Sequence, residues 1–304
     1  MRIGIGLPNA VPGRSPREVG RWAQESERLG FHSLGTIDRL LYDVLDPLVT
    51  LGVAAAVTER VELLPTVLNA GWRRNAVLFA KQLATVDLVS GGRLTAGLGI
   101  GGWPDDFAAS GAPATGHGRI LDDTLATLRA VWDGEVTGAA GPAPLPGTDR
   151  PGLLIGGTVP RSFARAARSG DGWVAPLMGD ALLTAGVGHV RAAWRAAGRT
   201  DRPRVVTGRY FSCGPDAEAV ASRYIAHYYG PEEKSPYYAP VRADVLDSDA
   251  KLSASLAALA GAGADDVVLY PCSAAPVQVG LLAGALERAG ARHEPAFTFR
   301  AASA

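Results

Sequence analysis

Residues 80–103 read AKQLATVDLVSGGRLTAGLGIGGW. The first part has the apolar spacing of a helix that ends at Gly91, and the second part is a short apolar strand that ends among glycines. Gly97, Gly99 and Gly102 have the G-x-G-x-x-G spacing of dinucleotide-binding turns, which lead from a first strand directly into a helix. Here the spacing ends the fourth predicted strand and precedes a loop of about fifteen residues. The context therefore argues against a Rossmann turn.

The same alternation of strand and helix continues along the whole chain. Eight β-rich runs, each followed by an amphipathic stretch, lie at 2–7, 32–37, 61–68, 93–100, 152–157, 171–176, 204–213 and 265–271. Strands joined by helices pair in parallel, and eight such units in 304 residues favour a closed (β/α)8 barrel, or TIM barrel. We therefore predict an α/β fold in which residues 1–304 form one domain. Insertions are expected at 103–117, after the fourth strand, and at 230–250, near the seventh helix.

Composition excludes several classes of function. Thirty basic and thirty acidic residues cancel, and no basic run exceeds a pair, so neither nucleic acid nor an anionic membrane surface is expected as a partner. The apolar runs are shorter than the roughly 20 residues of a membrane span. The two cysteines, Cys213 and Cys272, lie far apart without metal-ligand spacing. A reduced, cytoplasmic setting without a metal centre is the expectation.

Three segments together carry a family resemblance. They read WAQESERLGFHSLGTIDRL (22–40), AKQLATVDLVSGGRLTAGLGIGGW (80–103) and PGLLIGGTVPRSFARAARSGDGW (151–173). In this order they resemble the bacterial luciferase-like monooxygenase superfamily, whose members are flavin- or deazaflavin (F420)-dependent (β/α)8 barrels. The resemblance extends from residue 1 to about residue 290 and implies an oxidoreductase.

The turn Gly156, Gly157 and Thr158 is a candidate phosphate site. It ends a predicted strand and precedes a helix that starts near Pro160, and free backbone N–H groups at such a turn bind anions. The resemblance implies that the flavin phosphate binds here. A helix-capping turn without a ligand is the alternative.

Two other strand ends are candidates for contact with the flavin ring. Gly99, Ile100, Gly101 and Gly102 let the backbone approach a flat ring because glycine has no Cβ atom, and Trp103 is a candidate wall of the substrate pocket. The alternative is that these glycines relieve crowding inside the barrel.

The end of the third strand is the second of these candidates. The resemblance implies that Thr66, Val67, Leu68 and Asn69 lie against the ring, in some members with a non-proline cis peptide bond. Ordinary packing in the barrel core is the alternative, above all for Val67.

Asp38 and Arg39 mark a departure from the family, in which many members have Asp-His at this position. Arginine stays protonated at neutral pH and cannot act as a general base. Asp38 and Arg39 are both candidate catalytic residues, and Arg39 would bind an anionic substrate or stabilise negative charge on the reduced ring. The alternative is an Asp38–Arg39 ion pair on the surface, which contributes under about 1 kcal/mol.

The remaining candidates carry weaker signals. His117 precedes a helix in the loop after the fourth strand and is a candidate catalytic residue, although an exposed histidine is equally consistent with the sequence. Tyr210 lies on the seventh strand and is a candidate pocket residue. The aromatic stretch HYYGPEEKSPYY (227–238) suits a lid over an apolar substrate or a dimer contact.

The resemblance implies two main activities. The first is an FMN-dependent monooxygenase that receives reduced FMN from a separate flavin reductase and oxygenates a small organic substrate with dioxygen. The second is an F420-dependent oxidoreductase that transfers a hydride; a non-catalytic flavin-binding homologue is a third possibility. The missing Asp-His pair favours FMN. A homodimer is expected, because the helix containing PLVTLGVAAAV (47–57) and the helix at 75–92 are apolar on more than one face.

Overall fold

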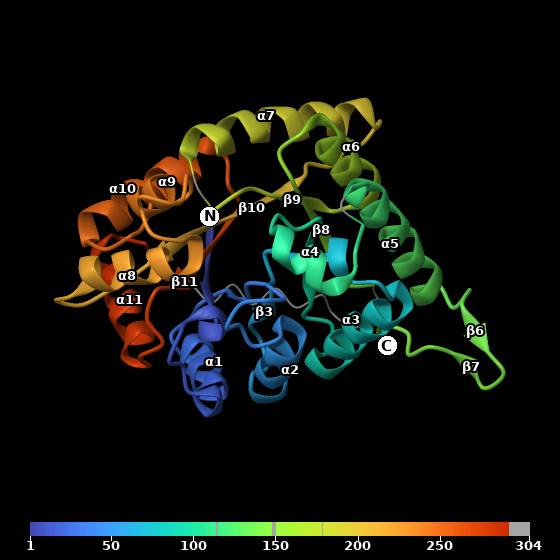
Figure 1. The fold of residues 1–304 in the computed structure, drawn as a ribbon, viewed down its shortest axis with the longest axis horizontal. Coiled ribbons are helices and arrows are strands. Elements are labelled where there is room, and N and C mark those ends of the chain that lie inside the picture. The colour runs from blue at the N-terminus through green and yellow to red at the C-terminus, as the bar shows by residue number, and fades with distance from the viewer. Residues whose placement is uncertain (114, 148–149, 178, 292–304) are drawn as a thin grey trace.

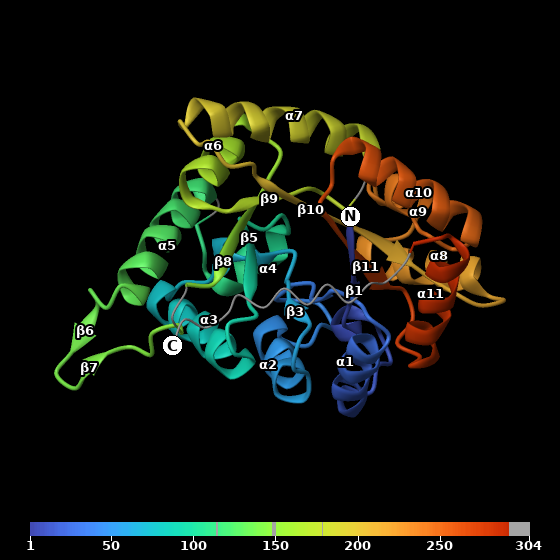
Figure 2. The ribbon, with the colours of Figure 1, turned by 180° about the vertical axis from the view of Figure 1, so that it is seen from behind.

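The computed structural model describes residues 1–113, 115–147, 150–177 and 179–291. Nine parallel strands form one curled sheet, and helices cover its outer face (Figures 1 and 2). The order across the sheet is β3-β2-β1-β11-β10-β9-β8-β5-β4. The strands are β1 (Arg2–Gly6), β2 (Ser33–Gly35), β3 (Glu62–Leu63), β4 (Leu68–Asn69), β5 (Thr95–Gly99), β8 (Gly152–Gly156), β9 (Gly172–Val174), β10 (Arg204–Phe211) and β11 (Asp266–Pro271).

The two ends of this sheet belong to one short stretch of chain. β3 and β4 are consecutive and only residues 64–67 separate them, so the strand predicted at 61–68 is divided in two. Leu63 pairs with Leu34 of β2 on one side and with Leu94, the residue before β5, on the other. The sheet therefore curls until β3 meets the start of β5, which confirms the predicted α/β class and parallel pairing. The Thr66–Val67 peptide bond in this stretch is cis.

Apart from β3, which continues into β4, each strand of this sheet leads into a helix, as the alternation predicted. The helices are α1 (Val19–Arg28), α2 (Pro47–Val57), α3 (Ala76–Ser90), α4 (Pro104–Ser110), α5 (His117–Trp132), α6 (Pro160–Ser169), α7 (Asp180–Ala196), α8 (Ala217–Tyr229), α9 (Tyr238–Ala243), α10 (Asp249–Ala262) and α11 (Val277–Arg288). Local signals define their ends: Asp46 and Asn75 accept hydrogen bonds from the first turns of α2 and α3, and Gly91 ends α3 in the left-handed conformation.

Two segments between the predicted strands contain regular structure that the alternation did not predict. The loop expected at 103–117 contains α4, which begins at Pro104 with two aspartates in its first turn and ends at Gly111 in the left-handed conformation. Proline and acidic residues favour a helix start and glycine favours its end, so these signals were present in the sequence. The stretch 137–152 contains a small antiparallel hairpin of β6 (Thr137–Gly138) and β7 (Gly141–Pro142), which projects away from the sheet (Figure 1).

The core has two parts because neighbouring side chains on a strand point to opposite faces. Leu153 and Ile155 of β8 belong to the larger cluster between sheet and helices, whereas Leu154 belongs to a second cluster inside the curled sheet. Tyr270 of β11 belongs to this inner cluster, and an ideal Cβ atom on Gly6 would lie 2.3 Å from its ring. The inner face therefore needs glycine where the aromatic side chain fills the sheet. The described residues form no helix with the length and hydrophobicity of a membrane span.

Candidate active site

A pocket of about 290 Å³ lies where the carboxyl ends of the strands converge. This is the end at which barrels of this kind carry their functional loops. The predicted residues that line it are Asp38, Thr66, Val67, Asn69, Gly99, Ile100, Gly101, Gly102, Trp103, Gly156, Gly157, Thr158 and Tyr210. The residues that sequence reasoning did not assign to the pocket are Ile37, Val174, Ala175, Pro176, Leu177, Tyr228 and Tyr229. The structure thus brings together the ends of six strands, β2, β4, β5, β8, β9 and β10, that are spread along the sequence.

Asp38 is buried at one side of this pocket and pairs with a different arginine from the one expected. Its Oδ2 accepts hydrogen bonds from the backbone N–H of Asn69 at 2.7 Å and from Nη2 of Arg73 at 2.9 Å. Asn69 returns a bond from Nδ2 to the Asp38 carbonyl at 2.8 Å. Burial raises the pKa of Asp38, and the Arg73 guanidinium acts in the opposite direction. The alternative of an Asp38–Arg39 surface pair is therefore wrong.

Arg39 is held beside the pocket and does not line it. Its Nε donates to Oδ2 of Asp106 at 2.7 Å, and both side chains are buried. Its guanidinium carbon lies 4.0 Å from the centre of the Trp103 ring. Arg39 therefore contacts a pocket wall from behind, through an ion pair with α4 and a cation–π contact.

Two further predicted residues lie outside the pocket lining. His117, the first residue of α5, stacks on Phe107 with ring centres 3.8 Å apart, and its Nε2 is 2.7 Å from the Pro113 carbonyl oxygen. Leu68 is fully buried in the cluster between sheet and helices, which corresponds to the packing alternative. The side chains of a strand alternate in direction, so Leu68 points away from the pocket while its neighbours Val67 and Asn69 line it.

The turn between β8 and α6 is ordered by its own side chains. Gly157 has φ +127°, and a Cβ atom there would lie 2.6 Å from Cβ of Ser162. Ser162 Oγ donates to the Val159 carbonyl at 2.7 Å and accepts from the Val159 N–H at 3.1 Å. Trp173 Nε1 donates to the Gly157 carbonyl at 2.8 Å. The turn therefore presents backbone to the pocket at the positive end of the α6 dipole.

The glycines after β5 have two different environments. A Cβ atom on Gly99 would lie 2.7 Å from Cγ2 of Val67, and one on Gly101, at φ +88°, would lie 2.7 Å from the Trp72 ring. A Cβ atom on Gly102 would meet no atom within 4 Å. Packing alone therefore explains glycine at Gly99 and Gly101, whereas Gly102 leaves space open beside the pocket.

One side of the pocket is aromatic. We call Trp103, Tyr210, Tyr228 and Tyr229 the aromatic wall; the ring centre of Trp103 lies 6.0 Å from that of Tyr228 and 6.1 Å from that of Tyr229. The hydroxyls of Tyr210 and Tyr229 are 3.0 Å apart. Burial raises the pKa of Tyr229 to about 12, so its hydroxyl is protonated at neutral pH. The stretch predicted as a lid thus supplies two pocket tyrosines from the end of α8.

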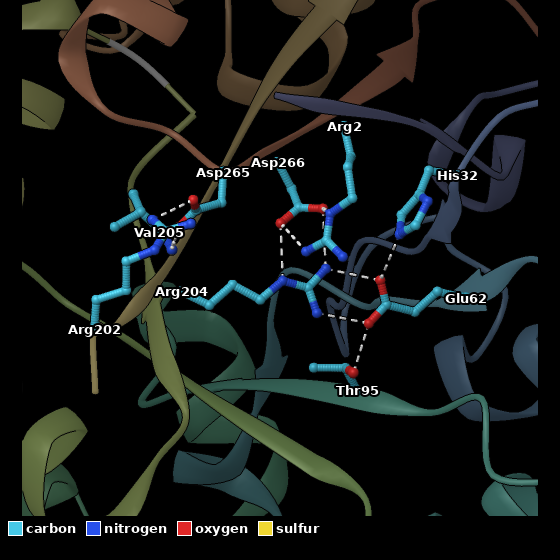
Figure 3. A network of polar contacts seen from close by, with 9 residues as sticks. All are labelled: Arg2, His32, Glu62, Thr95, Arg202, Arg204, Val205, Asp265 and Asp266. Carbon is cyan, nitrogen blue, oxygen red and sulfur yellow. Dashed lines mark hydrogen bonds and ion pairs between the residues drawn. The ribbon is translucent and has the colours of Figure 1, made fainter. Parts of the chain in front are cut away.

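A charged network that sequence reasoning missed lies at the amino ends of the strands, the opposite end of the sheet from the pocket (Figure 3). Arg204 donates to both oxygens of Glu62 at 2.7 Å and to both oxygens of Asp266 at 2.8 and 3.0 Å. Arg2 donates to Asp266, and Thr95 donates to Glu62. Each of these residues begins a strand, so β1, β3, β5, β10 and β11 are joined at this end.

This network also argues against a metal site and against a ligand cavity in the same region. Ligand atoms of His32, Glu62 and Asp266 lie within 4.8 Å of one another, as a metal site would require, but the Arg204 guanidinium occupies the space between the two carboxylates. A cavity of about 450 Å³ beside the network is lined by Arg2, Arg202 and Arg204. Carboxylates bind all three arginines, so the region has the character of a structural ion network.

Comparisons with known proteins agree with this geometry. The family model described as luciferase-like monooxygenase matches residues 1–274. An uncharacterised protein of Mycobacterium tuberculosis (strain ATCC 25618 / H37Rv) is 33% identical over 172 residues, which cover 53% of this chain and 60% of that protein. The match thus spans about three fifths of the length of this curated relative.

Solved structures with the same fold have different cofactors or activities. A monooxygenase from Streptomyces bottropensis superposes with a TM-score of 0.74 at 20% identity, over 95% of this chain and 99% of that chain. An F420-dependent secondary alcohol dehydrogenase in complex with an F420–acetone adduct superposes with a TM-score of 0.79 at 17% identity, over 96% and 99% of the two chains. At these identities the likeness shows the fold alone.

Proposed function

The chain belongs to the luciferase-like monooxygenase family, and on this premise we propose that it is a flavin-dependent oxygenase that uses reduced FMN and dioxygen on a small organic substrate. A separate flavin reductase supplies the reduced FMN. The structural relatives include a monooxygenase and an F420-dependent enzyme, so the family by itself leaves the cofactor open. The residues that line the pocket support FMN over F420.

The residues that line the pocket support the binding of a flavin. The turn Gly156–Thr158 offers backbone and a hydroxyl to a phosphate at the start of α6. The strand ends at Val67, Asn69 and Gly102 border the open part of the pocket, where backbone and one amide can approach a flat ring. These residues support the proposal that one pocket holds both the phosphate and the ring of the flavin.

The observation that carries the choice of FMN is that the described lining has no free histidine or carboxylate base, while burial raises the pKa of Tyr210 and Tyr229 and keeps their hydroxyls protonated. Among the described residues that line the pocket there is no histidine, and the one carboxylate, Asp38, is bound by Arg73 and by the Asn69 N–H. Hydride transfer to or from an alcohol requires a group that exchanges the hydroxyl proton. Oxygenation depends instead on a bound flavin, which supplies the electrons that activate dioxygen. The residues that line the pocket therefore suit oxygenation better than hydride transfer.

This chain's own residues then hold the cofactor and keep water out. The aromatic wall covers one side of the pocket with ring surface, and Val174, Pro176 and Leu177 add apolar surface from the end of β9. A dry pocket protects reactive intermediates from side reactions with water.

The proposal is tested by binding and by turnover. Purified protein is titrated with oxidised FMN and with F420, and we expect FMN to bind at least tenfold more tightly. Reduced FMN and dioxygen are then added with candidate substrates, and oxygenated product is sought by mass spectrometry. Tighter binding of F420, with hydride transfer in the absence of dioxygen, would establish the oxidoreductase instead. Binding of FMN without product from any substrate would favour a non-catalytic flavin-binding protein.

A further inference from the structure

The aromatic wall gathers four rings at one side of the pocket. Tyr228 and Tyr229 are adjacent at the end of α8, with ring centres 4.8 Å apart, and both lie about 6 Å from Trp103, which follows β5. Tyr210 reaches the same group from β10, with its ring centre 6.2 Å from that of Tyr229. Rings at these separations prefer edge-to-face or offset contact, and a further flat ring finds the same contacts.

The charges around the wall are already neutralised. Asp38, the one carboxylate among the described lining residues, is bound by Arg73. Arg39, which lies behind Trp103, is bound by Asp106. A charged substrate group buried here would lose its hydration without finding an unpaired counter-charge, which costs several kcal/mol. The side of the pocket formed by the aromatic wall therefore disfavours both carboxylates and ammonium groups.

A hydrogen-bonding position remains within the wall. The hydroxyls of Tyr210 and Tyr229 share one hydrogen bond at 3.0 Å. Each phenol has one proton and also accepts, so one of the two protons is committed to this bond and the other is left to donate. The pair can therefore donate to a hydroxyl or carbonyl oxygen of a ligand and accept from a hydroxyl.

From these contacts we propose that the substrate of this pocket is a neutral aromatic compound that carries a hydroxyl or carbonyl group. Its ring lies against the aromatic wall, and its oxygen binds the Tyr210–Tyr229 hydroxyl pair. This inference rests on the proposed function only in that it takes the position of the cofactor from it. The chemistry of the aromatic wall does not depend on the cofactor.

The first test varies the ligand and keeps the protein unchanged. Dissociation constants are measured by calorimetry for 2-naphthol and four matched probes: naphthalene lacks the hydroxyl, decahydro-2-naphthol lacks the aromatic rings, naphthalene-2-sulfonate is anionic, and 2-naphthylmethylamine is cationic. We expect 2-naphthol to bind at least tenfold more tightly than each of the others. Equal or tighter binding of an ionic probe would overturn the neutral class. Equal binding of decahydro-2-naphthol would overturn the aromatic one.

The second test assigns this preference to the wall. Tyr229→Phe keeps the ring and removes the hydroxyl, so the preference for 2-naphthol over naphthalene should fall to threefold or less. Trp103→Leu removes an aromatic ring, so the preference for 2-naphthol over decahydro-2-naphthol should also fall to threefold or less. Tyr238→Phe is the matched control, because Tyr238 lies in α9 outside the pocket lining, and it should leave both ratios unchanged. Unchanged ratios in both wall variants would place the ligand elsewhere. If a variant fails to fold, the ligand series on the unchanged protein still decides the class.

A third measurement separates this inference from the proposed function. The titrations are repeated with saturating oxidised FMN, and we expect the affinity for 2-naphthol to change by less than threefold because ring and wall are different parts of the pocket. Competition between 2-naphthol and FMN would overturn the placement against the wall. Failure of FMN to bind would overturn the proposed function, whereas the ranking of the probes without cofactor would still decide the substrate class.

Discussion

Arg39 and Asp106 form a buried ion pair, with Arg39 Nε 2.7 Å from Asp106 Oδ2, that joins the segment after β2 to α4. The second oxygen of Asp106 accepts the backbone N–H of Leu41 at 2.8 Å. The arginine that stands at the family's histidine position therefore acts on the pocket through α4 and through the Trp103 ring. It positions the wall and does not contact the pocket itself.

We expect Arg39→Ala to destabilise the protein by roughly 3–5 kcal/mol, because the Asp106 carboxylate would stay buried without its cation. Urea unfolding measures this loss. Arg288→Ala is a matched control: its pair with Asp249 has the same 2.7 Å distance but is exposed, so the cost should stay under about 1 kcal/mol. Equal losses in the two variants would show that burial of the Arg39 pair contributes nothing. A return toward wild-type stability in Arg39→Met with Asp106→Leu would confirm that the unpaired carboxylate is the cause.

Gly102→Val tests contact between the pocket backbone and the cofactor ring. A Cβ atom here would meet no protein atom within 4 Å, so the free energy of unfolding should change little while FMN affinity falls at least fivefold. Gly147→Val adds the same side chain in open space outside the pocket lining and should leave FMN affinity unchanged. Fluorescence titration of FMN gives both affinities. Wild-type affinity in Gly102→Val would place the ring elsewhere.

Gly157→Val tests the phosphate site. The new side chain would collide with Ser162 and shift the turn that carries Gly156 and Thr158, so FMN should bind at least tenfold more weakly. Gly134→Val is the control, because Gly134 also has a positive φ but lies outside the pocket lining. Riboflavin, which has no phosphate, makes the test specific: the preference of the wild type for FMN over riboflavin should disappear in Gly157→Val. A retained preference would rule out this turn.

Glu62 should contribute to stability against acid. Burial acts to raise its pKa, but the bonds from Arg204 and Thr95 outweigh it and hold the pKa below the ordinary value of about 4.3. The unfolded chain therefore takes up this proton first as pH falls, so the contribution is present above the unfolded pKa and is lost as pH falls through the folded pKa. Glu62→Gln should lower the free energy of unfolding at pH 7 by about 3 kcal/mol. Between pH 6 and pH 3 the variant should then lose less stability than the wild type loses. Exposed Glu59→Gln is the control for urea unfolding at each pH.

We propose that the chain forms a homodimer through α2 and the neighbouring α3. Val49 and Val53 on α2 are 69% and 43% exposed, and Leu78 and Val89 on α3 are 50% and 56% exposed. Val49→Asp should shift the sedimentation coefficient from dimer to monomer, because a carboxylate in an apolar interface loses hydration. Val277→Asp on α11, at 61% exposure, is the matched control and should leave the assembly intact. A monomeric wild type at micromolar concentration would contradict the proposal.

Local patterns were sufficient to predict the order of strands and helices. The helix that ends at Gly91 and the glycine turn at Gly156–Gly157 depend on residues adjacent in the chain, and the structure has both in place. The strand at 61–68 was predicted as one unit and is divided at residues 64–67, because its length was set by pairing with two different neighbours. α4 was missed although proline, aspartate and glycine marked its ends.

The sequence by itself determined that strands alternate with helices, that glycines end the strands, and that the strand ends would carry the pocket. Only the tertiary structure decided the partners of the charges: Asp38 pairs with Arg73 across 35 residues, and Arg39 with Asp106 across 67. It also brought Tyr228 and Tyr229 into the pocket and joined Glu62 to Arg204 across 142 residues. The reason is physical: helix and strand periodicity depends on near neighbours, whereas a buried charge binds whichever opposite charge packing brings within hydrogen-bond distance.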